Sequence, residues 1–182
     1  MTESSTERFE RLALPHLNAA YNLARWLTRD EQAAEDVVQE AYLRAFRFFA
    51  TFRGEDARPW LLAIVRNSAR TWFQTANAAR SQDEFDEEIH SAEAVLAPHT
   101  AQALGNPLLG LLHRERGLTV QSAIDELPLA FREVLVLREM EGLSYKEIAQ
   151  VVDVPVGTVM SRLARARALV AQLLAGEKEA LQ

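Results

Sequence analysis

Residues 154–170, VPVGTVMSRLARARALV, contain three arginines and no acid. The whole chain of 182 residues has a formal net charge of -6, so this segment departs locally from an acidic background. Guanidinium groups donate hydrogen bonds to phosphates and to the edges of guanine, which are both ligands of a nucleic acid. Net charge and charge distribution are separate properties. The segment therefore predicts a local nucleic-acid contact on an acidic protein.

A helical wheel at about 100° per residue divides this segment and its continuation into two faces. The face predicted to pack inward is apolar: Val156, Val159, Leu163, Ala166, Val170 and Leu173. The opposite face has small or polar side chains and one arginine: Gly157, Met160, Ser161, Ala164, Arg165 and Ala168. Arg162 and Arg167 lie on the two borders. Small side chains let a helix enter the major groove, although an ordinary amphipathic helix with a basic face has the same pattern.

The residues before this helix decide between the two interpretations. Ser144 to Glu147 have the S-x-x-E form of a capping box, which predicts the start of a short helix. Residues 153–155, DVP, predict a tight turn, and the small Ala149 lets two helices cross closely. A short helix, a turn and a longer helix make the outline of a helix-turn-helix. This combination favours DNA binding.

The chain as a whole predicts an all-α fold with two small helical domains, of which the C-terminal one is a helix-turn-helix. The domains are expected at residues 7–79 and 118–175, joined by a flexible linker at 80–117, because residues 81–99 contain acids and no Lys or Arg. In the first domain, Asp30 is expected to cap a helix. The apolar residues of that helix are predicted to face inward: Ala34, Val37, Val38, Ala41, Ala45 and Phe48. A further helix is expected to start near Pro59.

Other function classes find little support. Cysteine is absent, which excludes disulfides and cysteine zinc sites. Glu87 and His90 form one E-x-x-H, a spacing that di-iron bundles use twice, and His16, His99 and His113 add no ligand spacing. We expect no catalytic residue, no metal, no cofactor and no enzymatic activity. No apolar run is long enough to span a membrane and no signal core is present, so we expect a cytoplasmic location.

The helix-turn-helix sequence SYKEIAQVVDVPVGTVMSRLARAR resembles the promoter-reading domain of bacterial sigma factors of the extracytoplasmic-function (ECF) group. The upstream LPLAFREVLVLREMEGLSYKEIA is similar to the rest of that domain. AEDVVQEAYLRAF and FRGEDARPWLLAIVRNSAR resemble the other domain of the same group. Two motif sets in the right order make this resemblance specific. Met160 and Ala164 depart from the commonest pattern of the group.

The resemblance implies a specificity subunit of RNA polymerase that has no membrane insertion of its own. Its expected partners are core RNA polymerase, through the beta-prime coiled coil and the beta flap, promoter DNA, and an anti-sigma factor that holds it inactive. Asp36, Gln39 and Glu40 match the segment that docks on the coiled coil. The alternative interpretation of these residues is a helix start enriched in acids for its dipole.

The resemblance also implies two DNA-binding sets. The residues that match the capture of the minus-ten element are Phe52, Arg53, Trp60, Arg66, Asn67 and Arg70. The residues that match the helix in the minus-thirty-five major groove are Thr158, Ser161, Arg162 and Arg165. Two structural alternatives remain open: Trp60 as a core residue and Asn67 as a solvent-exposed or turn residue. A stand-alone helix-turn-helix regulator that binds an operator as a dimer is the alternative function, but it leaves the motifs of the first domain unexplained.

Overall fold

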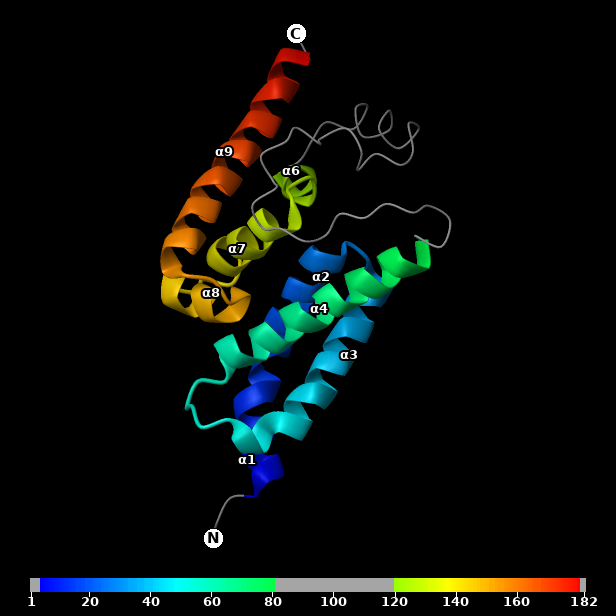
Figure 1. Ribbon diagram of the computed structural model, residues 1–182, viewed down its shortest axis with the longest axis vertical. Coiled ribbons are helices and arrows are strands. Elements are labelled where there is room, and N and C mark those ends of the chain that lie inside the picture. Colours follow the sequence, from blue (N-terminus) through cyan, green and yellow to red (C-terminus); the bar gives the residue numbers. More distant parts are fainter. Residues whose placement is uncertain (1–3, 81–119, 181–182) are drawn as a thin grey trace.

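The computed structural model describes residues 4–80 and 120–180, and all regular structure in these two ranges is helical. The first range holds α1 (Ser5–Ala13), η1 (Leu14–His16), α2 (Leu17–Thr28), α3 (Glu31–Phe48), η2 (Phe49–Thr51) and α4 (Arg58–Arg80). The second holds α6 (Val120–Asp125), α7 (Leu129–Glu139), α8 (Tyr145–Val152) and α9 (Val156–Ala180). The expected all-α class with a C-terminal helix-turn-helix is confirmed, and α8 and α9 are its two helices (Figure 1).

The sequence signals at helix ends act as expected. Asp30 caps α3, where its carboxylate accepts a hydrogen bond of 2.7 Å from the backbone N–H of Ala33. Ser144 and Glu147 form a complete capping box at the start of α8. Gly142, just beyond α7, has a φ of +67°, a left-handed conformation that a glycine adopts without steric cost. These local interactions fix where the helices begin and end.

Two predictions of inward-facing residues are wrong. Phe48 is 56% exposed, and Phe49 takes the core position with 2% exposure. The chain turns from α-helix into the tighter 3-10 helix η2 at Phe49, which changes the angular position of the residues that follow. Val156 is 38% exposed because it is the first residue of α9, while Val159, Leu163 and Ala166 on the next turns are buried.

Arg132 is a buried arginine that holds the second domain together. Its guanidinium donates to the backbone carbonyls of Ile124, Asp125 and Leu127 at 3.2, 3.0 and 2.6 Å. Ile124 and Asp125 are the last residues of α6 and Leu127 follows it, at the end of a helix where carbonyls lack intrahelical donors. A cation at the negative end of the helix dipole is also favourable. Arg132 thus links the end of α6 to α7 in addition to the apolar packing of Ile124 and Leu127.

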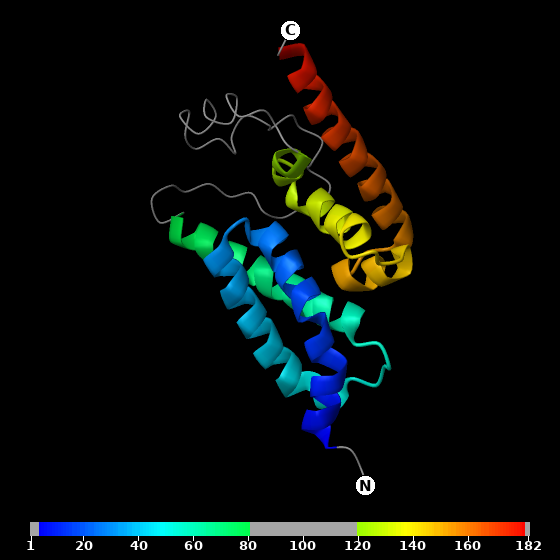
Figure 2. The ribbon, with the colours of Figure 1, turned by 180° about the vertical axis from the view of Figure 1, so that it is seen from behind.

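The two helical groups pack directly against each other. Helix α4 contacts α8 and α2 contacts α7, and both views of the ribbon show these pairs side by side (Figure 1, Figure 2). Leu62 and Val65 of α4 belong to the same contiguous hydrophobic cluster as Val134 and Leu137 of α7. The sequence predicts the two groups, but not this contact between them.

The capping box of α8 generates a stability prediction. Hydrogen bonds with Ser144 lower the pKa of the Glu147 carboxyl. A lowered pKa in the folded state means that the stabilisation is present above the ordinary glutamate pKa and is lost as pH falls through the lowered value. We expect Ser144→Ala to reduce the free energy of unfolding by about 1 kcal/mol at neutral pH and by less in acid. Urea unfolding across this pH range measures both effects.

Lys146→Ala is the matched control, because Lys146 is exposed in the same helical turn. An equal loss in the two variants, or a loss in Ser144→Ala that grows toward acid pH, would contradict the role of the capping box.

Candidate nucleic-acid interface

The exposed face of α9 is formed by small and polar residues. Met160 is 53% exposed, and Ser161 and Arg165 are exposed beside it, whereas Thr158 is half-buried. Ser161 donates its hydroxyl to the backbone carbonyl of Thr158 at 3.0 Å, which keeps that side chain close to the helix. Apart from Arg165, the face predicted to meet DNA carries no large polar side chain, which suits a helix that enters a groove.

The arginines of α9 differ in their surroundings. Arg167 forms an ion pair of 2.6 Å with Glu139 of α7, and the hydrogen bond to this carboxylate raises the pKa of Arg167. Arg162 is half-buried on the border of the face. Arg165 is exposed, and no hydrogen bond or ion pair involves it in the parts of the chain that the structure describes. Among the arginines of α9, Arg165 is thus the one most available to an external ligand.

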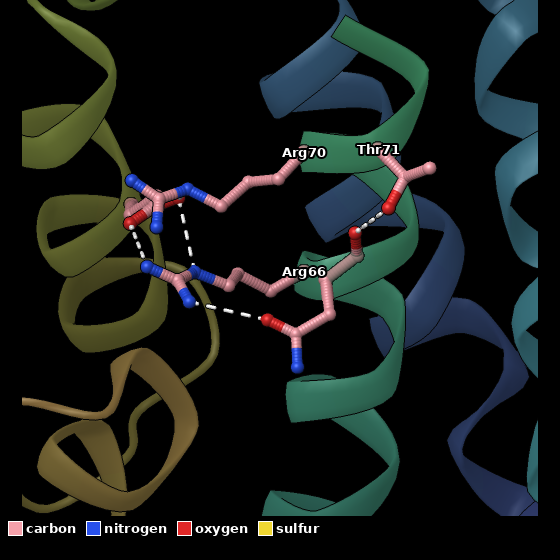
Figure 3. A network of polar contacts seen from close by, with 5 residues as sticks. Arg66, Arg70 and Thr71 are labelled. Carbon is pink, nitrogen blue, oxygen red and sulfur yellow. Dashed lines mark hydrogen bonds and ion pairs between the residues drawn. The ribbon is translucent and has the colours of Figure 1, made fainter. Parts of the chain in front are cut away.

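Two of the arginines predicted for the minus-ten element, Arg66 and Arg70, point from α4 toward the second domain (Figure 3). Arg66 donates to both carboxylate oxygens of Glu133 of α7, from Nε at 3.1 Å and from Nη2 at 3.2 Å. Arg70 Nε lies 3.3 Å from the same carboxylate. The side chain of Glu133 has no exposed surface, and that of Arg66 only 7%. In this arrangement Glu133 of the same chain binds the guanidinium groups of Arg66 and Arg70, which were predicted to bind DNA.

The neighbouring residues of this set are more accessible. Asn67 is exposed, and its side-chain oxygen accepts a hydrogen bond of 3.2 Å from Arg66. Its backbone carbonyl accepts from the hydroxyl of Thr71 at 3.0 Å. Arg53 is also exposed, at the start of the loop between η2 and α4. Asn67 and Arg53 therefore lie on the solvent side of the first domain.

The aromatic residues of the set pack within the first domain. Phe52 is 8% exposed, and its ring centroid lies 4.9 Å from that of Trp60 and 5.9 Å from that of Phe49. Trp60 is half-buried against the same cluster, as its core interpretation requires. A Cβ on Gly54 would come within 2.8 Å of the Phe52 ring, so any other residue here would require this packed ring to shift. The loop folds over its own aromatic core.

Arg8 is a residue of this site that the sequence did not indicate. Its guanidinium lies 5.9 Å from the centre of the Phe52 ring and donates to the backbone carbonyls of Phe52 and Gly54 at 3.4 and 3.2 Å. It ties the loop to α1. Because Arg8 is 44 residues from Phe52 in the sequence, no local pattern reveals the contact.

The residues predicted to contact polymerase share the outer face of α3. Asp36, Gln39 and Glu40 are exposed, and Glu40 forms an ion pair of 3.0 Å with Arg44. This row of residues lies between two shallow grooves. Gln39 lines one of about 390 Å³ against α2, and Asp36 and Glu40 line one of about 270 Å³ against α4.

Two apolar residues extend this row beyond what the sequence indicated. Leu43 is 50% exposed and Phe46 is 51% exposed. They follow Gln39 by four and seven residues, which places them on the same helix face. The available signal was helical spacing, since Leu43 lies opposite the buried Ala41 and Ala45 and Phe46 lies three residues after Leu43. We use the name docking stripe for Asp36, Gln39, Glu40, Leu43 and Phe46.

No group of three residues that suits a metal occurs in residues 4–80 and 120–180. Glu87, His90, His99 and His113 lie outside the described residues, so the structure does not test the single E-x-x-H. Within the described helices, none combines the length and apolar character needed to cross a membrane.

These features define a two-part helical protein with a helix-turn-helix and a basic recognition face. The comparison with family models agrees in both halves. Residues 12–91 match the model described as Sigma-70 region 2, and residues 118–170 match Sigma-70, region 4. The region 2 match is not expected of a stand-alone helix-turn-helix regulator.

Characterised relatives resemble the chain over most of its length. It is 38% identical to the RNA polymerase sigma-H factor of Pseudomonas aeruginosa over 160 residues, which cover 87% of this chain and 82% of that protein. It is 37% identical to the ECF RNA polymerase sigma-E factor of Haemophilus influenzae, covering 81% of this chain and 77% of that protein. The chain belongs to the ECF group of RNA polymerase sigma factors.

Two solved structures have a similar fold. One is the sigma factor RpoE in complex with the anti-sigma factor NepR from Bartonella quintana, with a TM-score of 0.65 and 26% identity over 92% of this chain and 96% of that chain. The other is CnrH in complex with the cytosolic domain of CnrY, with a TM-score of 0.61 and 27% identity over 92% of this chain and 88% of that chain.

The different environments of the arginines on α9 generate a prediction. We expect Arg165→Ala to weaken binding of duplex DNA about tenfold at low salt, since a side chain that reads a base or phosphate contributes about 1–3 kcal/mol. The slope of log affinity against log salt should also fall by about one if the lost contact is a phosphate. Fluorescence anisotropy with labelled duplex measures both quantities.

Arg167→Ala is the control for charge, because it removes the same cation from the same helix at a position engaged with Glu139. If both variants lose affinity equally, α9 acts as a diffuse basic surface and the assignment of Arg165 is wrong.

Proposed function

We propose that this ECF sigma factor binds core RNA polymerase and directs it to promoters by contacts with two DNA elements. The observation that carries the proposal is the presence, in one chain, of the exposed docking stripe on α3 and the exposed arginine face on α9. We further propose that it acts in the cytoplasm as an initiation factor, without catalytic residues, metal or cofactor of its own.

The docking stripe suits a helical partner with basic residues. The carboxylates of Asp36 and Glu40 and the amide of Gln39 can accept charge-assisted hydrogen bonds from arginines. Leu43 and Phe46 supply apolar surface on the same face, of the kind that becomes buried at the centre of an interface. We assign the stripe to the beta-prime coiled coil, with the beta flap as the expected contact of the second domain.

The DNA contacts divide between the two domains, for which we propose residues 7–79 and 118–175 with a linker at 80–117. In the second domain, Thr158, Ser161, Arg162 and Arg165 are assigned to the minus-thirty-five major groove. In the first domain, Arg53, Arg66 and Arg70 are assigned to phosphates of the melted minus-ten strand and Asn67 to a base edge. Phe52 and Trp60 form the wall of the loop, and opening of this loop would expose their rings for stacking.

An anti-sigma factor is the expected negative regulator. The two similar solved structures are complexes, one of RpoE with NepR and the other of CnrH with CnrY. We propose that a protein of this kind covers the docking stripe and the exposed face of α9 in the resting cell.

The test of the proposed function is transcription in vitro. Purified chain is added to core polymerase with a library of genomic fragments from the source organism, and the 5′ ends of the transcripts are sequenced. We expect start sites that core enzyme alone does not produce, preceded by two shared elements at fixed spacing. Start sites that are the same with and without the chain would contradict the proposal.

The docking stripe generates a prediction about polymerase binding. Asp36→Lys and Glu40→Lys should each weaken binding to core polymerase at least about tenfold, which corresponds to about 1.4 kcal/mol, because an attractive charge becomes repulsive. Glu10→Lys makes the same charge change at an exposed site on α1 and serves as the control. Affinity is measured by surface plasmon resonance, with helical content checked by circular dichroism. Unchanged binding in folded Asp36→Lys would remove the stripe from the interface.

A further inference from the structure

We infer that Glu133 of the second domain is an internal competitor for the DNA site of the first domain. The inference rests on the proposed function, because it takes Arg66 and Arg70 as ligands of the minus-ten strand. In the structure, the Glu133 carboxylate holds the place of a DNA phosphate between these two guanidinium groups. The described conformation is a closed form that does not capture the melted strand until α7 moves away from α4.

The geometry of the contact resembles the recognition of an anion. Arg66 donates from two nitrogens to the two oxygens of one carboxylate, at 3.1 and 3.2 Å. Arg70 adds a third nitrogen at 3.3 Å from the oxygen that Arg66 Nε also contacts. Forked contacts of this kind are how arginine binds carboxylates and phosphates. Glu133 thus uses the same nitrogens that a phosphate would require.

The burial of the contact makes the competition exclusive. Glu133 and Arg66 are almost fully enclosed, with side-chain exposures of 0% and 7%, so a strand cannot reach Arg66 beside Glu133. The side chain of Arg70 is 45% exposed and stays partly accessible. Capture of the strand by both arginines therefore requires separation of the two domains, whereas loose attachment to Arg70 does not.

A second ion pair closes the same boundary between α4 and the region before α8. Arg58, at the start of α4, donates to the carbonyl of Glu141 at 2.6 Å and to its carboxylate at 2.9 Å. The Glu141 side chain is only 5% exposed. Together with the continuous hydrophobic cluster, the two ion pairs hold the closed form at separate points.

The closed form covers one functional surface and leaves two accessible. Asp36, Gln39 and Glu40 remain exposed on α3, and Arg165 remains exposed on α9. Core polymerase and minus-thirty-five duplex can therefore bind the closed form, while the melted minus-ten strand cannot displace Glu133 without opening it. The apparent affinity for single-stranded DNA is reduced by the small fraction of open molecules.

Glu133→Gln tests the inference, because it keeps the size of the side chain and removes the charge that neutralises the two arginines. Glu139→Gln is the matched control: the same charge is removed from the same helix, but its partner Arg167 belongs to the same domain. The probe is a short fluorescein-labelled single-stranded oligonucleotide of mixed sequence. We expect at least about fivefold tighter binding for Glu133→Gln and less than about twofold for Glu139→Gln, as expected when the open fraction increases.

The opening itself is measured independently of DNA affinity. The chain contains no cysteine, so Gln32→Cys and Gln172→Cys place one spin label on an exposed site of each domain. We expect a single short distance in the parent chain, longer distances in Glu133→Gln, and longer distances in the parent chain when saturating single-stranded DNA is added. If Glu133→Gln does not fold, Glu141→Gln is used instead, because it breaks the second ion pair. It should also tighten oligonucleotide binding and lengthen the spin-label distances, to a smaller extent.

Three results would overturn the inference. The first is equal affinity gains in Glu133→Gln and Glu139→Gln, which would show a general charge effect. The second is a distance between the two spin labels of the parent chain that does not change when the oligonucleotide binds. The third is a Glu133→Gln chain that opens but binds the strand no more tightly. Failure of the proposed function is seen separately, as a chain that opens and binds DNA but gives core polymerase no new start sites.

Discussion

The contact between the two domains is built around one buried carboxylate that lies between two arginines. Glu133 has no exposed side-chain surface, so its charge has lost its hydration, and among the residues that the structure describes Arg66 and Arg70 compensate it. Removing one partner of such a buried pair typically costs about 3–5 kcal/mol, because an uncompensated charge stays behind. This is a large part of the about 5–15 kcal/mol by which a whole domain is stable. Loss of either partner is therefore expected to weaken the closed arrangement, which the Arg58–Glu141 ion pair and the continuous hydrophobic cluster also stabilise.

The same contact is a weak source of net stability when it is intact. Desolvation of a carboxylate and a guanidinium offsets most of their attraction, and apolar residues of similar size often do as well or better. Leu62, Val65, Val134 and Leu137 around the pair supply the apolar contribution to the interface. The pair instead makes the interface responsive to anions, because a phosphate that binds Arg66 removes the compensation of Glu133. A purely apolar boundary would not respond to DNA in this way.

Local structure was readable from the sequence because its causes are local. Asp30 lies three residues from the N–H that it caps, and Ser144 lies three residues from Glu147. The position of Phe48 was not readable, since the change from α-helix to 3-10 helix at Phe49 depends on how the aromatic cluster packs. Within the site, the exposure of Asp36 and Arg165 follows from helical periodicity. The partners of Arg66 and Arg8 do not, because they are 67 and 44 residues away.

The recognition helix explains why a closed form is compatible with promoter selection. Met160 and Ala164 leave α9 with few groups that read bases. Its affinity for duplex DNA is therefore expected to come mainly from Arg165 and from phosphate contacts. Phosphate contacts carry little sequence information. Specific binding then requires the first domain as well, held nearby by the polymerase, because tethering raises the effective concentration of the second contact. Because Glu133 occupies Arg66 and Arg70 of the first domain, this second contact forms only when the strand displaces Glu133. Partial sites that engage only α9 do not supply the melted strand that displaces Glu133, so the closed form favours promoters that have both elements.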